Sequence, residues 1–160
     1  MKRLIFLVFF LVLCQSSLAD QRFIDWSVTT TSNGNTIAAT VQDNADKMLA
    51  YICYKKLNSC VHVLMADIAC VDGQKYPVLV NSNTSALAMI GLCVAIENGK
   101  FELVLTEFDN IHRLLQQSST IGFAVPMESG LFKVVRFSLN GSSKAMDYAE
   151  KSLNSRSEYL

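Results

Sequence analysis

Apolar and polar residues alternate with a period of two along most of the chain. The clearest example is the segment 100–106, in which Phe101, Leu103 and Leu105 alternate with Lys100, Glu102 and Thr106. A period of two is the pattern of a strand with one buried face. Further segments with this pattern, or with a short apolar run, are 24–28, 37–41, 48–54, 60–65, 76–80, 86–96, 120–125 and 131–139. The sequence therefore predicts a mainly β protein.

Turn signals separate these segments and reduce the number of architectures that the strands can form. They include Asn33-Gly34, Asp72-Gly73 and Glu97-Asn-Gly99, and Asn-Gly is the strongest short hairpin signal. About eight or nine short strands at this spacing favour an antiparallel β-sandwich, or a barrel-like arrangement of the same strands. Pro77 lacks a backbone donor and predicts a strand start or edge. The long segment 86–96 is apolar on both faces, so we expect it to be central.

Two segments depart from the period of two. A short helix is predicted near 109–117, with Asp109 as its N-cap. A C-terminal helix is predicted near 143–153. Their apolar residues recur at helical spacing: Ile111, Leu114 and Leu115 in the first, and Ala145, Met146, Ala149 and Leu153 in the second.

The N-terminus has the features of a cleaved secretory signal. Two basic residues precede the apolar run 4–13, and Ser17-Leu18-Ala19 is a small-x-small cleavage site. The run is shorter than the roughly 20 residues of a membrane span. Lipoprotein processing at Cys14 is an alternative, although Leu13 before it is not small. We expect a signal peptide at 1–19, a single β-sandwich domain at 20–154 and a flexible tail at 155–160.

Four cysteines remain after removal of this signal: Cys53, Cys60, Cys70 and Cys93. In an exported chain they imply two disulfides, for which three connectivities are possible. Cys53 and Cys60 flank a loop between two predicted strands, so a cross-strand bridge forms if the register matches. Cys70 and Cys93 then pair by elimination. The spacings contain no Cys-x-x-Cys and match no familiar zinc pattern, so we expect no metal site and no cofactor.

Charge argues against two classes of partner. Removal of the two basic signal residues leaves 12 basic residues against 14 acidic ones, a net charge of −2. No basic stripe is present, so we expect no nucleic-acid partner and no binding to an anionic membrane surface. No second segment of membrane length follows the signal, so we expect no membrane span in the mature chain.

The sequence contains no complete catalytic motif, and we expect no catalytic residues. Its two histidines are His62, in a predicted strand, and His112, on the first predicted helix. Hydrolysis by a Ser-His-Asp set would need one of them beside a serine and a carboxylate, and Asp67 and Asp109 are the possible carboxylates. No Gly-x-Ser-x-Gly elbow marks a serine for that role.

Three tyrosines lie near the cysteines in the sequence: Tyr51, Tyr54 and Tyr76. Tyrosine is favoured at protein interfaces because its ring is apolar and its tip is polar. If exposed, these residues would form a possible binding surface. Packing within the fold is the alternative role of each.

Several segments together resemble the invasion-associated locus B family of exported bacterial proteins. They are the signal peptide, the early Asp25-Trp26 strand, the block 108–115, and the turn Phe137-Ser-Leu-Asn-Gly141 that leads into a helix. The resemblance implies a non-enzymatic, disulfide-bonded β-sandwich in the periplasm or at the cell surface, linked in some members to host interaction. It carries over no disulfide pairing and no binding residue.

Three functions are compatible with these features. The first is an exported, disulfide-stabilised protein of the periplasm or cell surface that binds an unknown protein partner, in host interaction or in the envelope. The second is a periplasmic immunity or inhibitor protein that blocks a toxin or hydrolase. The third is a hydrolase using His62 or His112. The sequence indicates neither the identity of the partner nor the oligomeric state.

Overall fold

The computed structural model describes residues 21–41, 47–96, 99–127 and 129–154. The predicted signal peptide, the polar segment 43–46 and the tail 155–160 lie outside these residues, as do residues 97 and 98 of one predicted turn. Within the described ranges, no helix combines the length and apolar character that crossing a membrane requires.

The described residues form a ten-stranded antiparallel sheet with two helices, which confirms the predicted mainly β class with slightly more strands than expected. Along the sheet the strands follow the order β1-β2-β3-β4-β5-β8-β7-β6-β9-β10. The strands are β1 (Gln21–Phe23), β2 (Trp26–Thr30), β3 (Thr36–Val41), β4 (Lys47–Tyr54), β5 (Ser59–Ala66), β6 (Lys75–Ser82), β7 (Ala86–Ala95), β8 (Phe101–Leu105), β9 (Thr120–Pro126) and β10 (Phe132–Ser138). The helices are α1 (Phe108–Gln117) and α2 (Ser142–Asn154).

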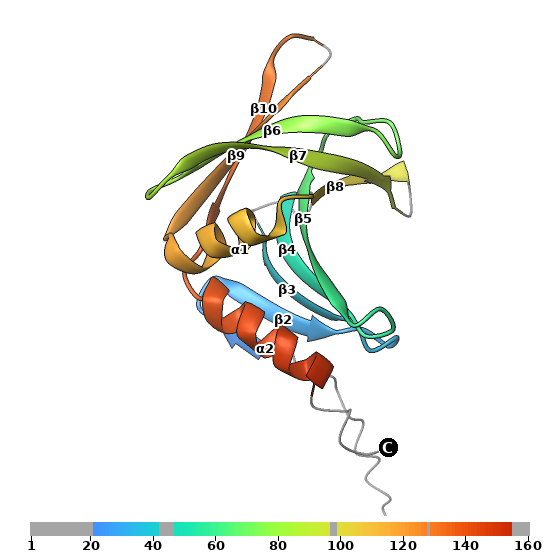
Figure 1. Ribbon diagram of the computed structural model, residues 1–160, viewed down its shortest axis with the longest axis vertical. Helices are drawn as coiled ribbons and strands as arrows, with labels where there is room; N and C mark the ends of the chain where they lie inside the picture. Colours follow the sequence, from blue (N-terminus) through green and yellow to red (C-terminus); the bar gives the residue numbers. More distant parts are fainter. Residues whose placement is uncertain (1–20, 42–46, 97–98, 128, 155–160) are drawn as a thin grey trace, which may run out of the picture.

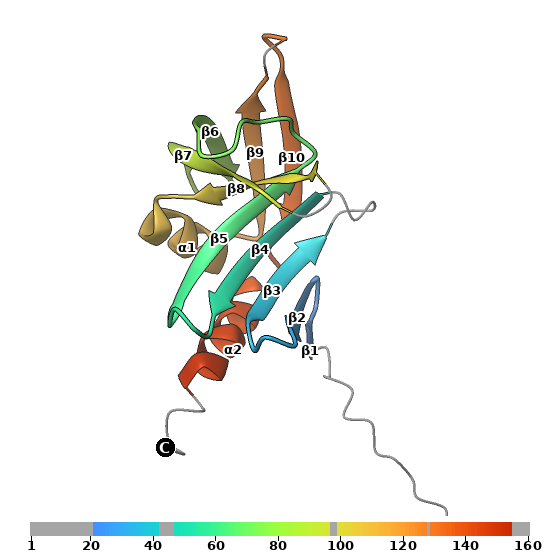
Figure 2. The ribbon, with the colours of Figure 1, turned by 90° about the vertical axis from the view of Figure 1, so that its right-hand side faces the viewer.

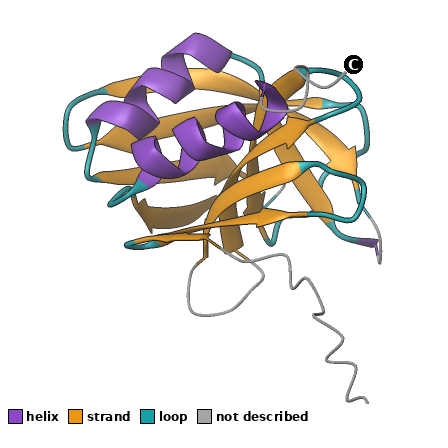
Figure 3. Cartoon of the chain, turned by 90° about the horizontal axis from the view of Figure 1, so that it is seen from below, coloured by secondary structure: helices purple, strands orange, loops and turns teal. Residues whose placement is uncertain are grey.

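The sheet bends around both helices (Figure 1). Seen from below, α1 and α2 lie side by side across one face of the strands (Figure 3). The inward side chains of the strands and the apolar sides of the helices form the core, whose largest members are Trp26, Tyr51, Phe123, Leu49 and Leu64. The predicted apolar sides of both helices are confirmed, since Ile111, Leu115, Ala145 and Met146 are fully buried.

The predicted positions of Pro77 and of segment 86–96 agree with the sheet. β7 lies between β6 and β8, as expected for a strand apolar on both faces. Pro77 faces Ile90 of β7 but lies outside the part of β6 that pairs with β9, which begins at Leu79. The N–H that Pro77 lacks would therefore lie in the part of β6 that pairs with β7 and not with β9.

The predicted start of the first strand, at residue 24, is wrong. Segment 24–28 was expected to be continuous, but β1 ends at Phe23 and β2 begins at Trp26. Ile24 has a φ of 57° and is 68% exposed, so it lies in a tight turn between two paired strands. The turn is held by a hydrogen bond from the Asp25 backbone N–H to the Asn140 carbonyl at 3.2 Å.

The predicted N-cap of α1 is also wrong. The helix begins at Phe108, and the N-cap position is Glu107, whose side chain makes no capping hydrogen bond. The first backbone bond of the helix runs from the Ile111 N–H to the Glu107 carbonyl. Asp109 instead lies in the first turn, where the helix dipole favours a negative charge.

The two ends of the sheet are joined by side-chain hydrogen bonds near the end of β10. The Trp26 indole N–H donates to the Ser138 carbonyl at 3.0 Å. The Ser138 hydroxyl donates to Asp25 Oδ2 at 2.6 Å. Gly141 follows directly, with a φ of 95° and no room for a Cβ beside the Phe23 carbonyl. The Asp25-Trp26 and 137–141 segments quoted in the sequence resemblance therefore meet here and have a structural role.

Both disulfides connect neighbouring parts of the sheet. Cys53 and Cys60 are directly opposite each other in β4 and β5, and their sulfur atoms are bonded. Cys70, before β6, is bonded to the buried Cys93 of β7. The Asp72-Gly73 turn lies between these two cysteines in the sequence. It is also bonded to Cys93, because the Gly73 N–H donates to the Cys93 carbonyl at 2.9 Å.

We expect the two disulfides to differ in their contribution to stability. Chain entropy assigns roughly 3.4 kcal/mol to the Cys70–Cys93 bond and roughly 2.5 kcal/mol to the Cys53–Cys60 bond, because the first closes the longer loop. Replacing each pair by alanine and measuring urea unfolding should therefore show the larger loss for the Cys70 and Cys93 pair. A larger loss for the other pair would contradict the entropic argument.

Candidate functional site

The outer side of β6, β9 and β10 presents apolar residues to solvent. Leu79, Ala124 and Val134 are directly opposite one another across these strands. Directly opposite residues of antiparallel strands point to the same side of the sheet. Leu79 is 49% exposed and Val134 is 56% exposed, whereas their neighbours Val78, Val80 and Val135, on the inner side, are buried.

This apolar surface continues over adjacent positions. Ala88 of β7 lies opposite Leu79, and Ile90 and Phe132 follow one register step along their strands. We define the outer apolar face by the residues Leu79, Ala88, Ile90, Ala124, Phe132 and Val134. Exposed apolar patches on protein surfaces mark interaction sites or ligand-binding grooves.

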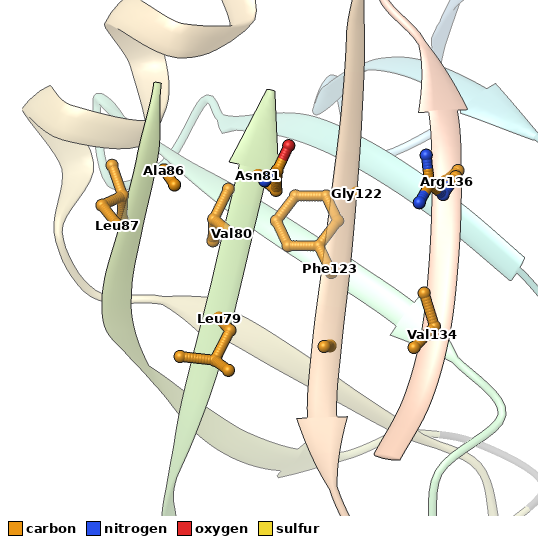
Figure 4. A pocket seen from close by; sticks show the side chains of 10 residues that line it. Leu79, Val80, Asn81, Ala86, Leu87, Gly122, Phe123, Val134 and Arg136 are labelled. Atoms are coloured by element: carbon orange, nitrogen blue, oxygen red, sulfur yellow. The ribbon is translucent and has the colours of Figure 1, made fainter. Parts of the chain in front are cut away.

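A groove crosses one end of the outer apolar face (Figure 4). Figure 4 shows Gly122 on the middle strand, with Leu79 and Asn81 on one side and Val134 and Arg136 on the other. Because Gly122 has no side chain, the backbone is the floor of the groove. Its volume is about 590 Å³, and a second hollow of about 480 Å³ adjoins it and shares Asn81, Gly122 and Arg136.

The β9–β10 hairpin extends past the body of the sheet (Figures 1 and 2). Near its tip, Leu131 is 69% exposed and Phe132 is 54% exposed. The hairpin is braced from the side by an ion pair between Lys133 and Asp67 at 3.1 Å. The apolar residues are thus held on a supported strand pair, a suitable arrangement for contact with a partner.

The predicted tyrosine surface is wrong for Tyr51. Tyr51 is 1% exposed, because the odd-numbered residues of β4 face the helices. Its hydroxyl donates to Glu150 Oε1 of α2 at 2.6 Å. Burial raises the pKa of Tyr51 well above its usual value, and the hydrogen bond to the Glu150 carboxylate raises it further. Tyr51 is therefore a core residue.

The other two tyrosines are half-buried and lie on different strands. Tyr54 is on the outer side of β4, where burial and then the charge of Glu102 raise its pKa. Tyr76 is on β6, and its hydroxyl accepts a hydrogen bond from the Val71 N–H at 3.0 Å. Whether either residue contacts a partner stays a prediction.

His62 and His112 are brought together although they are 50 residues apart in sequence. The Gln116 amide nitrogen lies 3.0 Å from His112 Nε2 and can only donate, so that His112 nitrogen accepts. His112 Nδ1–H then donates to His62 Nε2 at 3.3 Å. The proton of His62 is consequently on Nδ1, a buried atom with no partner among the described residues.

The surroundings of the histidine pair are aromatic. His62 stacks on Tyr51 with ring centroids 4.7 Å apart, and Phe108 lies 5.0 Å from it. Burial, and then the neighbouring His112, lower the pKa of His62 to about 3. A buried neutral imidazole bonded to a second imidazole is arranged for packing, and neither ring hydrogen-bonds to a serine within the described residues.

Within the described residues, no three His, Cys, Asp or Glu side chains are placed so that they could hold a metal ion. Asp67 pairs with Lys133, and Asp109 lies on the exposed side of α1. Neither carboxylate is among the hydrogen-bond partners of the histidine rings.

Sequence reasoning missed the outer apolar face. Its residues lie in segments that are apolar at successive positions, such as Val78-Leu79-Val80 and Val134-Val135. Such a run is expected either for a strand buried on both sides or for one with an exposed apolar side.

The comparisons with known proteins concern the fold. No family model matches the chain, and no curated protein matches it in sequence. Its structure is similar to a crystal structure of invasion associated protein B from Bartonella henselae, with a TM-score of 0.60 and 12% sequence identity. The similarity covers 82% of this chain and 95% of that chain. The ten-stranded sheet with its two helices thus has the fold of invasion associated protein B.

Proposed function

We propose that this is an exported, non-enzymatic protein of the periplasm or cell surface that binds another protein through the outer apolar face. The exposure of Leu79, Phe132 and Val134 on one supported side of the sheet carries the proposal. The two disulfides fit an oxidising compartment. The name of the structural neighbour, invasion associated protein B, adds a host or envelope protein as the class of partner.

The arrangement of the histidines supports a binding role over hydrolysis. A hydrolytic site needs a nucleophile within reach of its base and space for a substrate. His62 is fully buried and bonded to His112, while the groove of about 590 Å³ lies on the opposite side of the sheet from the helices. The lining of that groove is mostly aliphatic, with Asn81 and Arg136 as its polar side chains.

A matched pair of variants tests this proposal. Leu79→Asp places a charge in the centre of the outer apolar face, and Leu57→Asp makes the same change in the β4–β5 loop, where Leu57 is 71% exposed. The oxidised mature chain is immobilised and exposed to envelope and host-cell extracts, and captured proteins are quantified by mass spectrometry. We expect a captured protein whose recovery falls at least about tenfold for Leu79→Asp, since a buried unpaired charge costs several kcal/mol.

Leu57→Asp should leave that recovery unchanged. Both substituted side chains are exposed, so we expect both variants to fold. Circular dichroism and thermal unfolding check that they do. If every captured protein is recovered equally by wild type and both variants, the outer apolar face is not the binding surface. Loss of a chemical activity on replacement of His62 and His112 would instead support the hydrolase.

A further inference from the structure

All seven glycines of the chain lie in the described ranges, and Gly122 alone has no structural requirement for glycine. Gly91 is closely packed, since a Cβ there would lie 3.1 Å from the Leu103 side chain. At Gly122 the φ is outside the left-handed region, and a Cβ would meet Arg136 Cγ at 3.5 Å, an ordinary contact distance. The other five have a positive φ, which favours glycine: Gly34, Gly73, Gly99, Gly130 and Gly141.

Glycine at position 122 is unfavourable for the strand that contains it. Gly122 lies within β9, with Asn81 of β6 and Arg136 of β10 directly opposite. A glycine inside a strand weakens the strand, and it often marks a place where a ligand or another backbone approaches closely. An aromatic ring on a neighbouring strand can cover such a glycine, but neither opposite residue is aromatic. The bare backbone at Gly122 is therefore suited to a group supplied by another molecule.

The shape of the groove over Gly122 limits what can reach its floor. β6 and β10 lie on either side of β9, so their backbones are roughly 9–10 Å apart. The side chains of Leu79 and Val134 and the aliphatic stem of Arg136 narrow this width (Figure 4). The argument needs only the stem, because Arg136 has a further contact of its own. An α-helix with its side chains is about 10–12 Å across and would not reach the floor, whereas one flat side chain would.

The groove changes in polarity along β9. Toward Ala124 its walls are the apolar side chains of Leu79 and Val134. The hollow that adjoins it at Gly122 has mostly polar residues in its lining: Asn81, Ser82, Asn83, Thr120, Arg136 and Ser138. A ring placed over Gly122 would thus have apolar surface at one end and hydrogen-bonding groups at the other. Tyrosine and tryptophan combine an apolar ring with a polar tip in this way.

We propose that the partner inserts a tyrosine or tryptophan side chain into this groove, with its ring flat over Gly122. The ring lies between Leu79 and Val134, and its hydroxyl or indole N–H points toward the polar hollow. Aromatic side chains buried in pockets carry a large part of the binding energy of many protein interfaces. The inference rests on the proposed function and deepens it by naming the side chain that enters the outer apolar face. Glycine is then needed at 122 because a Cβ would lift the ring off the floor.

NMR titration of the oxidised mature chain with N-acetyl-tyrosinamide tests the proposal. Protons above the face of an aromatic ring are shielded, so the Gly122 Hα signals should move upfield as the probe binds. The shift should reach a plateau between about 1 mM and about 50 mM, a range suited to so small a ligand. N-acetyl-leucinamide has the same backbone without the ring, and it should produce no upfield shift at Gly122.

Gly122→Ala separates a binding role from a structural one. The methyl signals of Leu79 and Val134 report probe binding in this variant, and the dissociation constant should rise at least about tenfold. The urea midpoint should be unchanged or higher, because the backbone at this position accepts a Cβ. Ala88→Val is the matched control, since Ala88 is exposed on the same outer apolar face but outside the lining of the groove. Its dissociation constant should stay within about twofold of that of wild type.

Three results would overturn the proposal: no saturable shift at Gly122, equal shifts with both probes, or equal binding by wild type and Gly122→Ala. A lower urea midpoint for Gly122→Ala would also do so, because the fold itself would then require the glycine. The probe acts without a partner protein, so the two ideas can fail separately. Absence of probe binding, together with loss of capture by Leu79→Asp, would reject the aromatic side chain and keep the proposed function. Probe binding, with capture unaffected by Leu79→Asp, would reject the proposed function.

Discussion

Replacing Gly141 with alanine is expected to destabilise the fold by about 2–5 kcal/mol. The φ of 95° accounts for about 1–2 kcal/mol of this, because a Cβ is unfavourable in the left-handed region. The new Cβ would also overlap the Phe23 carbonyl, and displacing packed backbone costs about 1–3 kcal/mol. Since Phe23 ends β1 and the next turn is bonded to Asn140, the displacement would reach the junction between the two ends of the sheet.

Gly73→Ala is the matched control for the steric effect. Gly73 has a φ of 76°, but a Cβ there would meet nothing within 4 Å. Urea unfolding of the two variants with disulfides intact should show a loss of about 1–2 kcal/mol for Gly73→Ala and a larger loss for Gly141→Ala. Equal losses would mean that Phe23 moves away without cost.

Acid should destabilise the protein through His62. The pKa of His62 is about 3 in the fold and 6.5 in an ordinary exposed state, so the unfolded chain binds a proton that the folded chain does not. The contribution of the neutral imidazole is fully present above about pH 6.5 and is lost as the pH falls toward 3. The slope is about 1.4 kcal/mol per pH unit, and the whole window amounts to about 3–5 kcal/mol.

His62→Phe should remove this slope and keep an aromatic ring against Tyr51. The free energy of unfolding is measured by urea at a series of pH values from 7.5 to 4 for both proteins. Glu102 has its pKa raised by burial, which works in the opposite direction, because it stabilises the folded state at low pH. Its contribution is common to both proteins, so the difference between their curves isolates His62. Parallel curves would show that the His62 imidazole is already accessible to protons in the fold.

Local signals predicted much of the fold. The period of two in 100–106 and the Asn33-Gly34 turn correspond to β8 and to the β2–β3 hairpin. The apolar spacing in 143–153 corresponds to α2. These predictions succeeded because each segment contains, within a few residues, both the pattern and the turn residues that select its structure.

The errors arose where distant residues decide the outcome. Ile24 continues an alternating pattern, and only the bond between Asp25 and Asn140 shows that the chain turns there. Tyr51 lies in a strand that is apolar on both sides, so its orientation depends on where the helices pack. The exposure of Leu79 likewise depends on a side of the sheet that none of the described helices and strands covers. The sequence pattern contains none of this long-range information.

The bond between Trp26 and Ser138 also bears on when the chain can fold. It joins residues 112 positions apart, and the Gly141 turn and α2 follow it. A contact between such distant segments forms only after the cost of closing a very long loop is met, which makes folding slow. The two ends of the sheet therefore cannot be joined before nearly the whole chain has been synthesised. For the exported protein that we propose, the sheet would therefore stay open at this junction until the last helix has followed.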